Sequence, residues 1–358
     1  MLSLENITNS IHSWLNSTFS PTIALLLEFV IVGTCAIGLF ALLGLILVLM
    51  ERKVSAYMQI RLGPNRVGYA GSMQTLADTL KLAVKEGLTP DGADKFLFNL
   101  APYIVIIISM LILAPVPFAK GFQIWDMNIG VLFISAVSSI SVIGILMAGW
   151  ASNNKYSLLG AMRSGAQIVS YELSAGLSIL SIIVLTGSLK ISDIISSQQN
   201  GWWIFKGHIP AIIAFVIFII AITAETNRAP FDLAEAESEL TAGFHTEYSG
   251  MKFALFFLAE YVNIFIACSL GAILFLGGWM PLHIGNWSGF NHIMDFIPSS
   301  IWFISKVFFL IFVIMWFRWT FPRLRVDQLL NLEWKYLLPI SMFNLLLMTF
   351  VAIMGWHF

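Results

Sequence analysis

Long apolar runs recur along this chain, and no water-soluble fold could cover so many of them. They lie at roughly residues 22–50, 99–119, 129–150, 165–187, 210–226, 252–277, 300–320 and 336–356. Most of them supply the roughly 20 apolar residues that a helix needs to cross about 30 Å of hydrocarbon. The runs therefore predict an all-α, polytopic integral membrane protein with about eight transmembrane helices, and we treat residues 1–358 as a single membrane domain.

The composition agrees with a chain that is solvated mainly by lipid. Hydrophobic residues make up 58% of the sequence and charged residues only 11%, whereas a soluble domain carries about 25% charged residues. The net charge of −1 gives no reason to expect a nucleic-acid partner. Cys35 and Cys268 lie inside apolar runs, without a second cysteine or a histidine at metal-ligand spacing. We expect no iron–sulfur or zinc site in the chain itself.

The distribution of Lys and Arg predicts the orientation. Of the 19 such residues, Lys306 lies inside a span, Lys120, Lys190 and Lys206 lie in one set of loops, and the others lie in or beside the alternate set. By the positive-inside rule, the charged loops at residues 51–98, 151–164, 225–251 and 321–335 face the cytoplasm. The N-terminus then lies outside. No Lys or Arg precedes Arg52, so we expect the first run to remain as a span rather than to be a cleaved signal.

The first charged loop contains an amphipathic helical pattern after the turn residues Gly63-Pro64 and Gly68. Its apolar side chains are Met73, Leu76, Ala77, Leu80 and Val84, and its polar side chains are Gln74, Asp78, Lys81 and Lys85. Such a helix is too polar to span the bilayer and is suited to its surface. It is either a plain interfacial anchor or the roof of a cavity for an amphiphilic molecule.

The third charged loop is acidic. Its six acids are Glu225, Asp232, Glu235, Glu237, Glu239 and Glu247, with Arg228 as the one basic residue and His245 beside them. Helical spacing would place Asp232, Glu235 and Glu239 on one face, where like charges repel. The run is either a solvated acidic face or a set of carboxyl groups with raised and coupled pKa values that can pass protons.

Ionisable residues also lie within the spans themselves. Glu172 and Glu260 lie about two turns inside the fourth and sixth spans, and Glu225 ends the fifth. Since a charge at the bilayer centre costs about 2.5–3.5 kcal/mol on insertion scales, these acids indicate either neutral, hydrogen-bonded carboxyl groups or an internal polar path with Arg228 as counter-charge. Lys306 is a further candidate partner or proton relay, whereas Glu28 is expected to reach water near the outer end of the first span.

Four stretches carry a resemblance to a known family. They are residues 51–68, with Glu51-Arg52-Lys53-Val54 and Gly63-Pro64-Asn65-Arg66-Val67-Gly68; Gly149-Trp150-Ala151-Ser152-Asn153-Asn154-Lys155-Tyr156; residues 224–250; and Pro322-Arg323 with Asp327-Gln328-Leu329 and Trp334-Lys335. Together they resemble the family of membrane proteins, called the H subunit or subunit 1, that forms the quinone site of respiratory complex I. The resemblance extends from about residue 22 to residue 356.

The resemblance implies a subunit without a redox centre, at the junction of the hydrophilic and membrane arms of NADH:quinone oxidoreductase. Its charged loops would help to form the chamber in which quinone, either ubiquinone or menaquinone, is reduced. FMN and iron–sulfur clusters would belong only to partner subunits. The implied partners are the peripheral-arm subunits with the terminal cluster and the quinone site, small membrane subunits, antiporter-like subunits and lipid. The polar segment before the first span favours a bacterial inner membrane.

The resemblance also assigns roles by position, with no catalytic residue and no metal ligand in this chain. The quinone chamber would involve Glu51, Arg52, Arg61, Arg66, Arg228 and Phe231. Proton transfer and coupling would involve Asp78, Glu172, Glu225, Arg228, Asp232, Glu235, Glu237, Glu239, Glu247 and Glu260. Two alternatives are the related membrane subunit of an energy-converting hydrogenase and a stand-alone ion transporter, although the sequence lacks the repeated halves typical of transporters.

Overall fold

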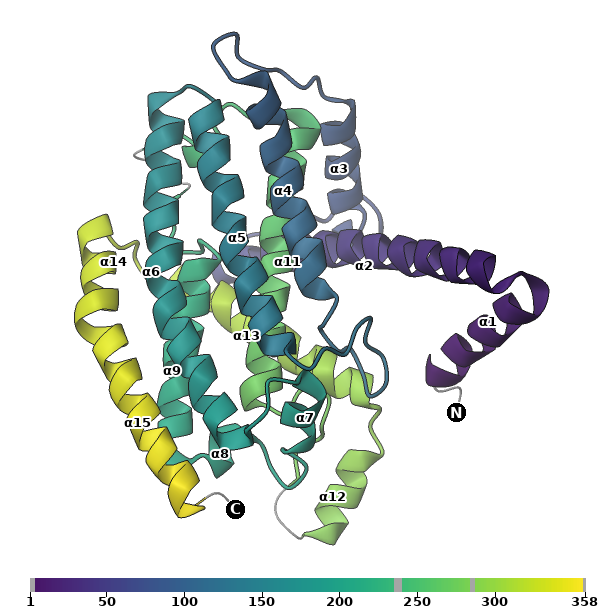
Figure 1. The fold of residues 1–358 in the computed structure, drawn as a ribbon. Coiled ribbons are helices and arrows are strands. Elements are labelled where there is room, and N and C mark those ends of the chain that lie inside the picture. The colour runs from purple at the N-terminus through teal and green to yellow at the C-terminus, as the bar shows by residue number, and fades with distance from the viewer. Residues whose placement is uncertain (1–3, 235–239, 284–286, 357–358) are drawn as a thin grey trace.

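The computed structural model describes residues 4–234, 240–283 and 287–356, and the regular elements in these ranges are helices (Figure 1). Eight helical segments there are long and apolar enough to cross a membrane. They are α2 (Pro21–Met58), α4 (Lys95–Leu113), α5 (Gly130–Ala151), α6 (Lys155–Thr186), α9 (His208–Glu225), α11 (Gly250–Phe275), α13 (Ser299–Thr320), and α14 (Val326–Leu332) with α15 (Leu338–Met354). The predicted all-α membrane fold is confirmed.

Two of these helices extend well into segments that the sequence predicts as loops. α2 continues to Met58 rather than ending near residue 50, because its last turns place charged side chains where they find partners. α6 begins at Lys155 rather than near 165, because the Asn154 side chain accepts a hydrogen bond from the backbone N–H of Tyr156 at 2.9 Å. Most of the predicted loop at 151–164 is therefore helical.

Two further helix ends differ from the prediction near prolines and near the C-terminus. α4 ends at Leu113 rather than at residue 119, because Pro115 and Pro117 cannot donate backbone hydrogen bonds to continue it. The predicted loop at 321–335 is helical from Val326, and a π-helical turn at Glu333–Leu337 joins α14 to α15.

α11 forms the centre of the bundle. Its second half is buried nearly throughout, and Phe265 and Phe275 pack there with Phe218 of α9 and Phe303 of α13. α4, α5, α6 and α9 stand beside it, roughly parallel (Figure 1). α2 instead leaves the bundle sideways, and α1 (Leu4–Thr18) lies at its far end. Since a helix rises 1.5 Å per residue, α2 is about 57 Å long.

Short helices lie at both ends of the bundle. The predicted amphipathic helix is α3 (Gln74–Val84), which packs near α2 and α11. Most of its apolar side chains are exposed, Val84 by 87%. The opposite end holds α7 (Ile191–Ser196), α8 (Trp203–Lys206) and α12 (Ser288–Asp295) (Figure 1). Two short 3₁₀ turns, Tyr69–Gly71 and Gly243–His245, belong to the charged loops.

Candidate functional site

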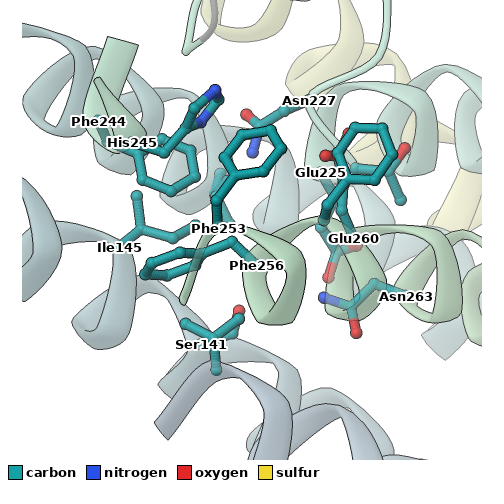
Figure 2. A pocket seen from close by; sticks show the side chains of 14 residues that line it. Ser141, Ile145, Glu225, Asn227, Phe244, His245, Phe253, Phe256, Glu260 and Asn263 are labelled. Carbon is teal, nitrogen blue, oxygen red and sulfur yellow. The ribbon is translucent and has the colours of Figure 1, made fainter. Parts of the chain in front are cut away.

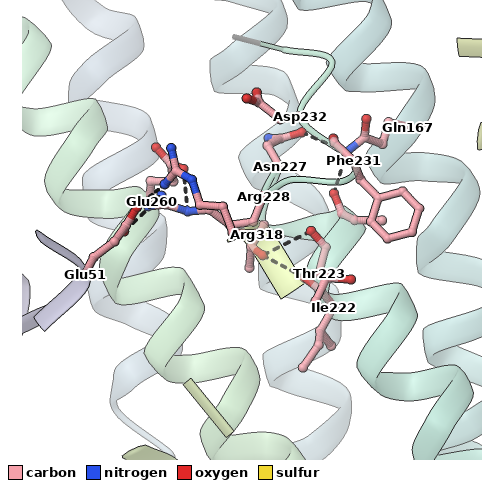
Figure 3. Close-up of polar contacts among 12 residues, drawn as sticks. Glu51, Gln167, Ile222, Thr223, Asn227, Arg228, Phe231, Asp232, Glu260 and Arg318 are labelled. Atoms are coloured by element: carbon pink, nitrogen blue, oxygen red, sulfur yellow. Dashed lines mark hydrogen bonds and ion pairs between the residues drawn. The ribbon is translucent and has the colours of Figure 1, made fainter. Parts of the chain in front are cut away.

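Arg228 is the centre of a buried charged cluster near the α3 end of the bundle (Figure 3). It follows α9 directly, and its backbone N–H donates to the Thr223 carbonyl at 3.2 Å. Its Nη1 donates to both carboxylate oxygens of Glu51, at 3.1 Å each. Its Nε lies 3.1 Å from Oε1 of Glu260, and the guanidinium stands 4.5 Å above the Tyr261 ring.

Glu51 contacts more than one cationic side chain. Besides Arg228, it accepts hydrogen bonds from Arg318 of α13 and from the Tyr261 hydroxyl. Only 7% of Glu51 is exposed. A buried carboxylate is stable only when charges and hydrogen bonds replace its hydration. Glu51 and Glu260 against Arg228 and Arg318 make such a balanced set.

A second ion pair connects this region to the surface helix α3. Arg52 of α2 donates to Asp78, which also accepts from Gln74 at 3.1 Å. Partial burial would raise the pKa of Asp78, but the hydrogen bonds from Arg52 and Gln74 outweigh it and hold the pKa below its usual value. Asp78 is therefore a fixed negative charge at neutral pH.

A cavity of about 50 Å³ lies between α5, α11 and the turn at Gly243–His245 (Figure 2). Glu225, at the end of α9, and Glu260, on α11, both line it. Asn263 lies one turn after Glu260, and His245 lies on the other side beside Phe253. Glu260 therefore contacts Arg228 and also faces this cavity.

A larger cavity of about 170 Å³ adjoins the first and shares Ser141, Glu225, Thr226 and Asn263 with it. Glu172 of α6 lines its other side. Two serines of α5 bind the acids: Ser139 donates to Glu172, and Ser138 hydrogen-bonds to Glu225. Both cavities exceed the roughly 10–15 Å³ that one water needs, and they have polar lining groups.

The comparison with known proteins identifies the family. The sequence model of a family described as NADH dehydrogenase matches residues 30–349. The H subunit of the NADH-quinone oxidoreductase of Bacteroides fragilis is 58% identical over all 358 residues of both chains, as is that of Bacteroides thetaiotaomicron. The corresponding protein of a Geobacillus species is 46% identical over 343 residues, 96% of each chain.

The chain belongs to the family of NADH-quinone oxidoreductase H subunits. It is an integral membrane protein, as the eight apolar helices in the described part of the chain require. The family match begins inside α2, whereas the Bacteroides sequences of the same family also align with α1.

Other positions to which the family resemblance assigns a coupling role lie away from the two cavities. Glu247 accepts from Asn154 at 2.6 Å, between the α5–α6 connection and the start of α11. Asp232 lies in a non-helical turn, where Arg323 donates to its backbone carbonyl and lies 3.9 Å from its carboxylate. The predicted helical face therefore does not include Asp232. Glu235, Glu237 and Glu239 lie outside the described residues.

Three positions expected to line the quinone chamber are not part of the charged cluster. Phe231 is buried against Tyr171, with ring centroids 5.4 Å apart, so its side chain packs in the core. Arg61 and Arg66 are exposed on the loop after α2, and Arg61 donates to Gln59 at 2.6 Å.

Several side chains of the site were not singled out by the sequence. Arg318 contributes only to the prediction of membrane orientation. No sequence pattern around Tyr261 marks it as part of a site. Asn263 and the serines of α5 could have been found, because polar residues one turn apart in apolar spans are unusual.

His245 is the remaining titratable group at the cavity, and burial lowers its pKa to about 4, so it is neutral at pH 7. Among the described residues, no group of three or more His, Cys, Asp or Glu is placed to hold a metal ion.

Proposed function

We propose that this chain forms the membrane side of the quinone chamber of NADH:quinone oxidoreductase and couples quinone reduction to proton translocation. The observation that carries the proposal is the meeting of α2, α11 and the segment after α9 at the cluster of Glu51, Arg228 and Glu260, next to two adjoining acidic cavities. One side of this cluster faces the charged loops, and the other side faces the bundle interior.

The exposed surface around the loop after α2 supports a chamber completed by partners. Ile60 and Leu62 are 97% and 89% exposed, and Tyr69 is 93% exposed. Large apolar side chains exposed in this way mark interaction sites. We propose that peripheral-arm subunits, which would hold FMN and the iron–sulfur clusters, cover this loop, and that Arg61 and Arg66 then face quinone. Small and antiporter-like membrane subunits would pack on the lipid-exposed helices.

The proposed coupling follows from the shared guanidinium. Reduction of quinone to quinol takes up two electrons and two protons. Because Glu51 and Glu260 both contact Arg228, proton uptake at one carboxylate leaves Arg228 to interact more strongly with the other. A protonation change at the chamber would thereby alter the charge beside the cavity that contains Glu260 and Glu225. Water in the two cavities would carry the proton on toward Glu172.

We also propose a bacterial inner membrane as the location, with the N-terminus on the periplasmic side. The relatives named above come from bacteria. The charged cluster and α3 lie at one end of the bundle, which would be the cytoplasmic end.

The first test is made on the purified complex. We expect NADH oxidation with a short-chain quinone that is sensitive to a quinone-site inhibitor, with flavin and iron–sulfur signals in the same particle. Glu172→Gln and Glu225→Gln should lower the protons pumped per quinone reduced. Glu28→Gln is the matched control, since Glu28 lies on α2, pairs with His12 at 2.5 Å and is remote from both cavities. Unchanged reduction and pumping in both variants would exclude the path.

A further inference from the structure

Lys306 of α13 is a buried basic residue that lies outside the charged cluster. It is 6% exposed and lies at the end of α11 opposite that cluster. Among the described residues, no ion pair joins it to a carboxylate, so the acidic partner considered from the sequence is not found there. Its Nζ instead donates to three backbone carbonyls, those of Leu276 at 2.5 Å, Gly278 at 3.0 Å and Met280 at 2.5 Å.

The surrounding acceptors favour the charged form of this side chain. Three carbonyl acceptors require three N–H donors, which an ammonium has and a neutral amine lacks. Nζ also lies 4.4 Å from the ring centroid of Trp202 and 5.8 Å from that of Trp302. Aromatic faces attract cations most strongly where water is excluded. The carbonyl oxygens and two indole rings around Nζ are thus a set of groups that stabilises an ammonium.

The backbone after α11 is shaped to present these carbonyls. Gly277 and Gly278 have φ angles of 75° and 52°, and the Gly278 N–H turns back to the Ala272 carbonyl at 2.8 Å. A Cβ on Gly277 would lie 2.8 Å from Cδ1 of Trp202, so the close packing of this indole also needs glycine. The negative end of the helix dipole adds to the attraction for a cation.

A second side chain completes the cap of the same helix end. Gln198, in the segment between α7 and α8, is fully buried and donates to the Ile273 carbonyl at 2.9 Å. Trp202 is itself fixed, because its Nε1 donates to the Pro281 carbonyl at 3.2 Å. The site around Nζ is therefore rigid on the α11 side, and its ligand arrives from α13.

We propose that the turn Leu276–Met280 is a binding site for a primary ammonium group, which Lys306 fills from α13, locking the two helices together. This inference goes beyond the proposed function and does not depend on it. α11 carries Glu260, Tyr261 and Asn263, and α13 carries Arg318. Lys306 is thus a positioning residue that fixes the far end of both helices whose near ends meet at the charged cluster.

The test uses chemical rescue in the intact complex. Lys306→Ala removes three methylene groups and the ammonium, which n-propylammonium replaces atom for atom. We expect the variant complex to dissociate at a lower temperature. Millimolar n-propylammonium should return the dissociation temperature most of the way to that of the native complex. Tetramethylammonium, which has the charge but no N–H donor, should not restore it. Lys306→Met, which fills the space with an apolar side chain, should not respond to either cation.

Equal effects of the two cations, or no recovery with n-propylammonium, would overturn the proposal. The dissociation temperature measures the contact between α11 and α13 and does not depend on quinone reduction. A negative result for the ammonium site is therefore distinguishable from a failure of the proposed function. If Lys306 positions Glu260, n-propylammonium should also restore the protons pumped per quinone in Lys306→Ala but not in Lys306→Met.

A second measurement keeps the proposal testable should Lys306→Ala not assemble. Amine acylation of the native complex, quantified by mass spectrometry, should label Lys306 at least tenfold less than the exposed Lys120, because an ammonium held by three carbonyls is not nucleophilic. Gly277→Ala, which displaces Trp202 and the turn, should raise the labelling of Lys306 and leave that of Lys120 unchanged. Equal labelling of both lysines, or no response to Gly277→Ala, contradicts the site.

Discussion

Arg228 donates from a single nitrogen to both carboxylate oxygens of Glu51, at 3.1 Å each, across 177 positions of sequence. The contact joins the end of α2 to the segment after α9, and the same guanidinium reaches Glu260 through its Nε (Figure 3). One buried cation therefore connects a carboxylate on the side of the charged loops with a carboxylate that lines a cavity inside the bundle.

Removal of Arg228 should affect both stability and activity. Arg228→Met leaves two carboxylates with less compensation in a buried site, and we expect destabilisation of about 3–5 kcal/mol. Quinone reduction by the purified complex should fall more than tenfold. Arg228→Lys should recover only part of the loss, because an ammonium cannot reproduce the planar fork of the guanidinium. Full activity of Arg228→Met in a stable complex would contradict the shared-cation arrangement.

The pair of Arg52 and Asp78 should contribute modestly, since both side chains are partly exposed. We expect Asp78→Asn and Arg52→Gln each to destabilise the complex by about 1 kcal/mol or less. The pKa of Asp78 is lowered from 3.8, so the pair is fully formed above that pH and is lost as pH falls below it. A double-mutant cycle on thermal stability at pH 7 measures the pair, and additive effects of the two changes would show that it is not coupled.

Ser139 should influence Glu172 without altering the charged cluster. Ser139→Ala removes the hydroxyl that donates to this carboxyl group. With about 1 kcal/mol lost per hydrogen bond, the rate of coupled proton transfer should fall about fivefold. Ser139→Thr should preserve the hydroxyl and most of the rate. Proton uptake into sealed vesicles gives the measurement. Ser109→Ala on α4 is the control, because its hydroxyl donates to the Val105 carbonyl and the residue lines neither cavity.

His245 predicts a pH dependence of stability. Burial lowers its pKa to about 4 from an ordinary value of 6.5. Between these values the unfolded chain binds a proton that the folded chain does not, so the free energy of unfolding decreases as pH is lowered from 6.5 toward 4. The stability is fully present above pH 6.5. His245→Asn should flatten this part of the profile of unfolding temperature against pH, and identical profiles would show that the pKa of His245 is the same in the folded and unfolded chain.

The sequence by itself determined the membrane fold. Lipid selects long apolar segments one at a time, so each span could be recognised without knowledge of its neighbours. The same local reasoning identified Glu172, Glu225, Glu260 and Arg228, because charged residues stand out in apolar spans. It misplaces the start of α6, although the Asn154 cap is visible in the sequence, because charged residues at the end of an apolar span are typical of a loop.

Only the tertiary structure decided which of these groups meet. Arg318 reaches Glu51 across 267 positions, and Lys306, expected to pair with an acid or relay protons, binds backbone carbonyls instead. Such contacts depend on the rotation and crossing of packed helices, which hydropathy does not encode. Phe231 packs on Tyr171 and its carbonyl accepts from Gln167 of α6, while its place in the quinone chamber stays a prediction. The lipid environment thus fixes where the helices are, and packing fixes which charges can act together.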